Sequence, residues 1–301
     1  MSVSLNINSG RIFTLLKDKV KDYAMLMKYR LNLTVVFSAV IGYWLALGGQ
    51  FNAAGLFWLT LGGFLVTGAA NAINQVLEKD YDKLMKRTQL RPVASGRMGV
   101  TEGLLVAGIS ATAGALVLFY FFNSLAAFLG ILSLLLYAFV YTPLKRIGSV
   151  AVAVGAIPGA LPPLIGWAAG YGALSYEAYL LFSIQFIWQF PHFWAIGWLG
   201  SEEYAKAGYK LHPAPDERNE KTALRMVVYI LFLVMLTIYP VMLGIASYYF
   251  LAAGLLLGIG FLYAGIRLLL NCNQQNALGV MLASILYLPL LQIAMLADVI
   301  F

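Results

Sequence analysis

Three oxygen-bearing side chains recur at four-residue intervals in the first third of the chain. Asn74, Glu78 and Asp82 are spaced i, i+4 and i+8, which would align them on one face of a helix. They follow an apolar run and precede a basic stretch, and acidic groups at the end of a membrane helix are costly. Carboxylates clustered beside arginines indicate a divalent metal that holds a phosphorylated ligand. The alternative is a solvated helix end with local ion pairs, such as Glu78 to Lys83 or Asp82 to Lys86.

A second polar stripe lies in the second half of the chain. Gln185, Gln189 and His192 are spaced i, i+4 and i+7, and Pro191 should bend their helix and free a backbone carbonyl. A lone buried histidine is usually structural, but two glutamines on the same stripe favour a functional site. The surrounding aromatic residues predict either an interfacial belt or the walls of a flat, apolar ligand site: Trp188, Phe190, Phe193, Trp194 and Trp198.

A third polar element is the pair Lys145 and Arg146, which follows Tyr141-Thr-Pro-Leu. Two adjacent cations can hold a phosphate, or they can simply mark the inner face of a membrane protein. The next apolar segment is rich in glycine and proline, a composition that allows close helix packing and is typical of a helix that lines a cavity.

These groups must be positioned by membrane helices. The chain has 301 residues, of which 61% are hydrophobic and only 11% charged, with a mean hydropathy of +0.80, whereas soluble domains carry about 25% charged residues. We predict an all-α fold, a single membrane-embedded domain over 1–301 in which nine transmembrane helices surround a central cavity. The single cysteine excludes an intramolecular disulfide, and no signal peptide is evident. The predicted spans, each near the roughly 20 residues that cross a bilayer, are 32–49, 54–77, 100–122, 124–141, 148–169, 176–199, 222–246, 248–270 and 277–299.

The basic residues define the orientation. With a cytoplasmic N-terminus, all 20 Lys and Arg lie at or beside the inner connections, as the positive-inside rule requires. This distribution explains the +7 charge by topology and argues against nucleic-acid binding. Three inner segments are long: 1–31, predicted as a cytoplasmic amphipathic helix leading into the first span, and 78–99 and 200–221, predicted as active-site loops. The repeated order of helix, polar cluster and long loop resembles a duplicated unit.

The first polar cluster resembles the aspartate-rich motif of the intramembrane aromatic prenyltransferases, through Asn74-x3-Glu78-x3-Asp82 and the later Arg-Thr-x2-Arg-Pro-x2-Ser-Gly of 87–96. Within that superfamily the chain is most similar to the protohaem IX farnesyltransferase (haem O synthase) branch. The segments that carry this likeness are Trp-Gln-Phe-Pro-His-Phe-Trp at 188–194, Glu-Tyr-Ala-Lys-Ala-Gly at 203–208 with Pro213, Tyr-Thr-x2-Lys-Arg at 141–146, and Gly-Ala-Leu-Pro-Pro-Leu-Ile-Gly at 159–166. The family usually has Asp where this chain has Glu78 and Glu203.

The resemblance implies an activity and its substrates. A farnesyl group would pass from farnesyl diphosphate to the 2-vinyl group of haem B, with addition of water, giving haem O and diphosphate. Mg²⁺ would serve the diphosphate. The partners would be farnesyl diphosphate, haem B, the lipid bilayer and a downstream membrane enzyme that modifies haem O. The protein would lie in a bacterial cytoplasmic (inner) membrane, with its active-site loops in the cytoplasm.

The resemblance also assigns roles to residues. Mg²⁺ would be held by Asn74, Glu78 and Asp82. The diphosphate would be bound by four cations: Arg87, Arg91, Lys145 and Arg146. The haem would be contacted by His192, Gln189, Trp188, Trp194 and Arg30, with His192 as the candidate axial ligand. Gln189, His192 and Glu203 join the metal-binding residues as catalytic candidates, and Glu202 and Glu203 could bind a second metal or take a proton.

Three alternatives share part of this pattern: a prenyltransferase with another acceptor, a transporter and a structural membrane subunit. A prenyltransferase with a quinone precursor or another lipid acceptor would share the first motif, and only the block around His192 distinguishes it. A transporter would place polar residues at mid-membrane in several spans, whereas here they cluster at the inner ends of two. A purely structural membrane subunit would not need the buried amides and the histidine.

Overall fold

The computed structural model describes residues 9–301, without the side chains of residues 9–13 and 15. All of the regular structure in this part of the chain is helical, which confirms the all-α prediction. The long helices are α1 (Ser9–Leu26), α2 (Tyr29–Ala46), α3 (Ala53–Leu77), α5 (Val100–Phe121), α6 (Ser124–Leu135), α8 (Val150–Tyr171), α9 (Tyr176–Lys206), α10 (Glu220–Met242), α11 (Tyr248–Leu270) and α12 (Gln274–Ile300). Short elements lie between them: α4 (Lys79–Asp82), a π-helical turn η1 (Leu136–Tyr141), α7 (Thr142–Leu144) and a 3₁₀ turn η2 (Pro215–Glu217).

The number of membrane spans differs from the prediction. Within residues 9–301, seven helical segments are long and apolar enough to cross a bilayer, or eight if the bent pair Leu16–Leu26 and Tyr29–Ala46 forms one span. The count of nine is therefore not confirmed. The segment expected at 176–199 is helical, as part of α9, but α9 carries the polar stripe of Gln185, Gln189 and His192 and is not among the seven.

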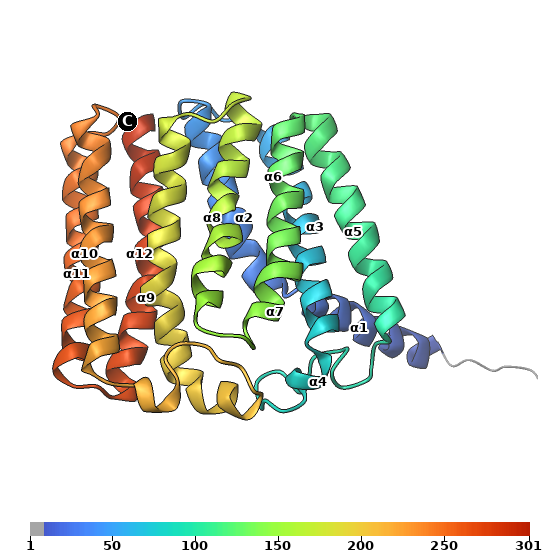
Figure 1. Cartoon of the computed structure of the whole chain (residues 1–301). Coiled ribbons are helices and arrows are strands. Elements are labelled where there is room, and N and C mark those ends of the chain that lie inside the picture. Colours follow the sequence, from blue (N-terminus) through green and yellow to red (C-terminus); the bar gives the residue numbers. More distant parts are fainter. Residues whose placement is uncertain (1–8) are drawn as a thin grey trace, which may run out of the picture.

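The helices form one upright bundle (Figure 1). Helices α9 to α12 occupy one side, α3, α5 and α6 the other, and α2 and α8 lie between them. The long loops that follow α3 and α9 gather, together with α4, at one end of the bundle, at the level of α1. This arrangement brings the two long polar loops to the same end, as the topology predicted.

Glycines allow α2 and α8 to pack closely at the centre. A methyl group on Gly166 would overlap the carbonyl oxygen of Ala39, and one on Gly42 would overlap the carbonyl oxygen of Pro163. The obstructing atoms are backbone atoms, which cannot rotate away. Small residues at such contacts let two membrane helices approach through their backbones.

The prolines of α8 release a carbonyl that a glutamine then uses. Pro163 has no N–H to donate to Gly159, four residues earlier, so that carbonyl lacks its helical partner. Gln185 Nε2 on α9 donates to it at 2.8 Å. Gln292 Nε2 on α12 donates to Gln185 Oε1 at 3.1 Å, and Ser38 Oγ on α2 donates to Gln292 Oε1 at 3.2 Å. Gln185 therefore links α9 to α8 and α12, Gln292 extends the network to α2, and the role of Gln185 in it is structural.

A break between α1 and α2 corrects the predicted N-terminal segment. The amphipathic helix expected through residue 30 ends at Leu26, and the chain bends by 49° before Tyr29. Lys28 adopts a left-handed conformation with φ of 49° in the break, which is uncommon for a residue with a side chain. The part of the prediction that concerns residues 1–8 lies outside the described residues.

Candidate functional site

The first polar cluster begins where α3 ends. Helix α3 ends at Leu77, where the predicted span 54–77 also ends. The single helical face predicted for Asn74, Glu78 and Asp82 does not form, because Glu78 has φ of −98° and ψ of 6° and α4 starts at Lys79. The turn is tightened and not lost, because the amides of Tyr81 and Asp82 both donate to the Glu78 carbonyl oxygen, at 3.0 and 2.8 Å. The predicted helical stripe is thus interrupted at Glu78.

Both carboxylates are buried and paired with distant cations. Glu78 is 5% exposed and Asp82 0%. Lys145 Nζ lies 2.8 Å from Glu78 Oε1, and Arg91 Nη1 donates to both oxygens of Asp82 at 2.8 Å. The local pairs of Glu78 with Lys83 and Asp82 with Lys86 do not form, so a solvated helix end is ruled out.

Burial and charge shift the two carboxyl groups in opposite directions. Burial alone raises the pKa of Glu78, but Lys145 and Lys28 outweigh it, so the pKa lies below its ordinary value. Burial raises the pKa of Asp82 above its ordinary value, and Arg91 offsets this only in part. Two acidic groups of unequal proton affinity thus share one water-poor site.

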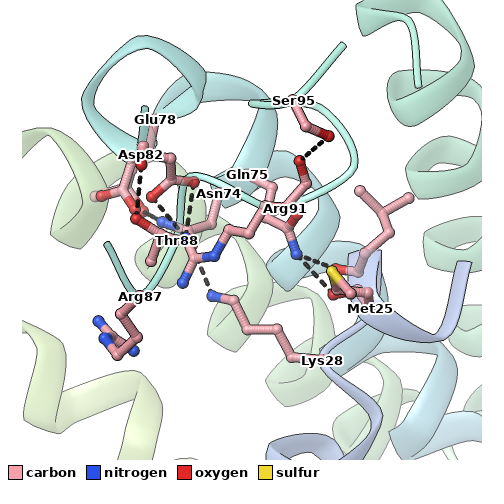
Figure 2. A network of polar contacts seen from close by, with 12 residues as sticks. Met25, Lys28, Asn74, Gln75, Glu78, Asp82, Arg87, Thr88, Arg91 and Ser95 are labelled. Atoms are coloured by element: carbon pink, nitrogen blue, oxygen red, sulfur yellow. Dashed lines mark hydrogen bonds and ion pairs between the residues drawn. The ribbon is translucent and has the colours of Figure 1, made fainter. Parts of the chain in front are cut away.

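Lys28 also joins this cluster, although no motif in the sequence points to it. Its Nζ donates to Asn74 Oδ1 at 2.8 Å, and Asn74 Nδ2 donates to Thr142 Oγ1 at 3.2 Å. Figure 2 shows the Lys28 side chain extending from the chain break toward Asn74, beside Arg91 and Asp82. The cluster therefore holds two carboxylates and three basic side chains, and these basic groups suit an anion.

A π-helical turn positions Lys145. The turn at 136–141 ends with Thr142 Oγ1 donating to the Tyr137 carbonyl oxygen, five residues earlier, at 2.8 Å. Such π segments are frequent at functional sites. Lys145 Nζ lies 4.7 Å from the centroid of the Tyr141 ring, and that ring fits only because position 155 is a glycine, where a methyl group would come within 2.5 Å of it.

The other predicted cations lie farther out. Arg146 lies over the Tyr81 ring and donates to its hydroxyl at 2.5 Å, and Arg87 donates to the Tyr204 hydroxyl at 3.4 Å. Arg30, which was predicted to contact the haem and not the diphosphate, is exposed and donates to the hydroxyl of Tyr29 at 2.8 Å.

The second loop contacts the first one through Glu203. Its Oε2 accepts a hydrogen bond from the backbone N–H of Lys86 at 2.8 Å. The neighbouring Glu202 is exposed and pairs with Arg218 at 3.2 Å. Within the described part of the chain, no three His, Cys, Asp or Glu side chains gather in a metal-binding group. Glu203 thus joins two loops and is not positioned here for a second acidic centre.

The histidine of the second stripe is held in one orientation. His192 Nδ1 lies 2.8 Å from Ser284 Oγ on α12, and Ser284 Oγ lies 2.6 Å from the Met281 carbonyl oxygen. A carbonyl only accepts, so the serine hydrogen points to Met281 and Ser284 Oγ must accept from His192. His192 therefore carries its proton on Nδ1. The Trp188 ring stacks on it with centroids 4.5 Å apart, and Trp188 Nε1 donates to the Ser284 carbonyl oxygen at 2.7 Å.

Gln189 and Trp194 have separate surroundings. Gln189 Nε2 donates to the carbonyl oxygens of Ala156 and Gln185, and its side chain occupies the space left open at Gly159. Trp194 is buried and packs edge-on against His212, with ring centroids 5.6 Å apart. Gln189 therefore faces α8, whereas His192 faces α12.

Comparison with known proteins identifies the class. The model of the UbiA prenyltransferase family matches residues 35–287. Solved structures agree on the fold. A structure described in work on digeranylgeranylglyceryl phosphate synthase has a TM-score of 0.78 and 19% identity, covering 94% of this chain and 99% of that one. A UbiA homologue from Archaeoglobus fulgidus bound to GPP and Mg²⁺ has a TM-score of 0.65 and 14% identity, covering 92% of this chain and 99% of that one. This chain therefore belongs to the UbiA prenyltransferase family and is a multi-pass membrane enzyme.

Sequence relatives narrow the class further. The protoheme IX farnesyltransferase of Cytophaga hutchinsonii is 43% identical over 94% of this chain and 99% of its own length. The enzyme of the same name from Flavobacterium johnsoniae is 41% identical over 97% of this chain and 99% of its own length. The resemblance to the haem-modifying branch is thus confirmed across nearly the whole chain.

Proposed function

We propose that this chain transfers the farnesyl group of farnesyl diphosphate to the 2-vinyl group of haem B, giving haem O and diphosphate. The observation that carries the donor half is the buried cluster of Glu78 and Asp82, each paired with a cation. Its polar groups come from α3, the first loop, the α1–α2 break and the segment after η1. The nearly full-length likeness to protoheme IX farnesyltransferases supports the acceptor.

The donor cluster fits a magnesium-bound diphosphate. Mg²⁺ is usually held by one or two carboxylates together with substrate phosphates, and Glu78 and Asp82, with the Asn74 amide between Lys28 and Thr142, supply such donors. A bound magnesium ion would neutralise charge on the diphosphate oxygens. Lys28, Arg91 and Lys145 would bind the same anion, by exchanging part of their contacts with the protein for contacts with it.

Cleavage at this cluster needs positive charge where the leaving group develops negative charge. The farnesyl C1–O bond breaks with both electrons going to the diphosphate, and cations fixed in advance stabilise that charge without reorganisation. The allyl cation must then be kept from water, which the apolar helices of the bundle achieve. The vinyl π electrons form the new C–C bond, water adds to the resulting cation on the haem side, and that water loses a proton.

The acceptor would be recognised at His192. Because Nδ1 holds the proton and donates to Ser284, the lone pair of Nε2 is free to coordinate iron. Imidazole is a common axial ligand of haem, and a hydrogen bond from the other ring nitrogen is the usual way in which proteins orient such a ligand. The stacked ring of Trp188 adds a flat apolar surface beside it.

The distribution of the basic residues supports a location of this chemistry at the cytoplasmic face of a bacterial inner membrane. Both loops that contact the donor cluster lie at the end of the bundle where α1 and α4 gather (Figure 1). Water-soluble diphosphate would leave on this side, whereas haem and the farnesyl chain would partition into the bilayer. A downstream membrane enzyme that modifies haem O would collect the product there.

Mass spectrometry of haems extracted from cells that express the chain tests the proposal. We expect a hydroxyethylfarnesyl haem that is absent from cells carrying Asp82→Asn. A prenylated quinone precursor without any new haem would support the quinone alternative instead. The variant His192→Ala should lose haem B binding in membranes while it retains diphosphate binding, and unchanged haem binding would refute the role of His192.

A further inference from the structure

A turn after α9 brings Tyr209 over the donor cluster. Gly208 has φ of +72°, a conformation that glycine adopts without strain, and it reverses the chain at the end of the helix. The backbone N–H of Tyr209 donates to the Tyr204 carbonyl oxygen at 2.9 Å, and that of Lys210 donates to the Lys145 carbonyl oxygen at 2.8 Å. The second loop is thereby fixed against the segment that supplies Lys145.

The side chain of Tyr209 is enclosed on several sides. It is 7% exposed and packs with Met85 of the first loop. The Tyr81 ring lies 5.9 Å from the Tyr209 ring, between centroids, and Lys145 Nζ lies 5.9 Å from the same ring. Tyr209 therefore contacts the same lysine that pairs with Glu78.

The hydroxyl of Tyr209 is buried without a hydrogen-bond partner among the described residues. Leaving such a group unsatisfied is unfavourable, and proteins rarely do so without a reason. Tyr287 on α12 shows the usual situation, because it is 1% exposed and its hydroxyl pairs with Thr237 at 2.9 Å. Four buried side-chain atoms lack a partner among the described residues, in Asn32, Gln75, Trp167 and Tyr209, and that of Tyr209 is the only hydroxyl among them.

The electrostatic surroundings of this hydroxyl are those of the donor cluster. Burial and the nearby carboxylates of Glu78 and Asp82 raise the pKa of Tyr209 above its ordinary value. The phenol therefore keeps its proton at neutral pH and is a donor. Glu78 is close enough for this effect, but no hydrogen bond of acceptable geometry joins the two side chains.

We propose that Tyr209 binds the diphosphate directly, its buried hydroxyl donating a hydrogen bond to a diphosphate oxygen at the cluster of Glu78, Asp82 and Lys145. The second loop then contributes to donor recognition through a phenol and not through Glu203, whose carboxylate is occupied by the Lys86 amide. The same contact would serve a prenyl diphosphate and free diphosphate. This proposal rests on the donor half of the proposed function and is independent of the acceptor.

The test compares Tyr209→Phe with Tyr287→Phe in the full-length protein, reconstituted in lipid nanodiscs. Tyr209→Phe loses a buried hydroxyl at the donor cluster, and Tyr287→Phe loses a buried hydroxyl away from it. The measurements are the inhibition constant of inorganic diphosphate with Mg²⁺, the KM for farnesyl diphosphate and the thermal midpoint of unfolding. A hydrogen bond to a charged group contributes about 1.5–3 kcal/mol, so Tyr209→Phe should weaken diphosphate binding about ten-fold or more.

The thermal midpoint separates binding from structure. We expect Tyr209→Phe to keep or raise it, because an unsatisfied group is removed, and Tyr287→Phe to lower it without changing diphosphate binding. The proposal would be overturned if Tyr209→Phe bound diphosphate as tightly as the wild type, whether or not its thermal midpoint were lower. If the wild type binds diphosphate but forms no haem O, the proposed acceptor is refuted. The role of Tyr209 is then still decided by the inhibition constant of diphosphate for Tyr209→Phe. If the wild type binds no diphosphate, both the donor half and the role of Tyr209 are refuted.

Discussion

Replacing Lys145 by methionine would remove the charge that keeps Glu78 ionised in a buried site. The two groups are 2.8 Å apart, and their side chains are only 12% and 7% exposed. Removing one partner of a buried ion pair costs about 3–5 kcal/mol, and this is an upper bound here because Lys28 remains nearby. The protein can avoid this cost by protonating Glu78, and a protonated carboxyl group is a poor ligand for magnesium.

The direction of the pH effect follows from the balance at Glu78. In the wild type, burial raises the pKa of Glu78, but Lys145 and Lys28 hold it below its ordinary value. The ionised carboxylate therefore stabilises the fold at neutral pH, and this contribution is lost only as the pH falls through the lowered pKa. Without Lys145, burial dominates and the pKa rises. The ionised fraction in the variant then increases with pH across the neutral range.

The assay is haem O formation by Lys145→Met and wild type, with Mg²⁺ titrated at each pH from about 6 to about 9. We expect the variant to be at least about ten-fold slower than the wild type at the acidic end, since each 1.4 kcal/mol corresponds to a factor of ten. The difference in rate between variant and wild type should shrink as the pH rises. Loss of a diphosphate contact alone would lower the rate by a constant factor. Lys145→Arg, which keeps the charge, is the control. A ratio of wild-type to variant rates that does not change with pH would refute the reasoning.

Three further substitutions test other parts of the structure. Asp82→Asn should lower activity about 100-fold or more, since it removes a magnesium ligand and leaves Arg91 without its charged partner; retained activity with an unshifted Mg²⁺ dependence would exclude Asp82 from the metal site. Ser284→Ala should weaken iron coordination by His192 about 10–100-fold, measured from the absorption spectrum of bound haem, and an unchanged spectrum would argue against the proposed orientation. Gly166→Ala should destabilise the α2–α8 contact by about 1–3 kcal/mol. Its control is Gly260→Ala, where a methyl group meets nothing within 4 Å; equal thermal midpoints would contradict the close packing.

The sequence predicted those parts of the molecule that depend on local pattern. Apolar runs located most of the long helices to within a few residues, and polar, basic stretches located the two long loops, which lie at the same end of the bundle. The types and spacing of Asn74, Glu78 and Asp82 indicated an anion-binding metal site, and the structure buries all three. Burial of these groups follows from their position at the end of an apolar helix, which a sequence displays directly.

The partners of these groups could not be predicted, because they are set by packing between distant segments. Lys28 lies 46 residues from Asn74 in the sequence. No glycine, proline or asparagine marks the break between α1 and α2 that turns the Lys28 side chain toward the cluster. In a continuous amphipathic helix it would be one more interfacial lysine. Tyr209 and Ser284 lack a sequence signal for the same reason, since a tyrosine after a glycine and a serine in an apolar helix are both commonplace.

The link between Pro163 and Gln185 has a consequence for how this sequence can change. Replacing Pro163 alone by alanine would return a backbone donor to the Gly159 carbonyl oxygen, which Gln185 now uses. Replacing Gln185 alone by leucine would leave that carbonyl without a partner in a lipid-surrounded bundle. Loss of Gln185 would also leave Gln292 Nε2 without the acceptor that it now uses. Pro163, Gln185 and Gln292 should therefore vary together, and aligned relatives that lack both the proline and Gln185 should also lack Gln292.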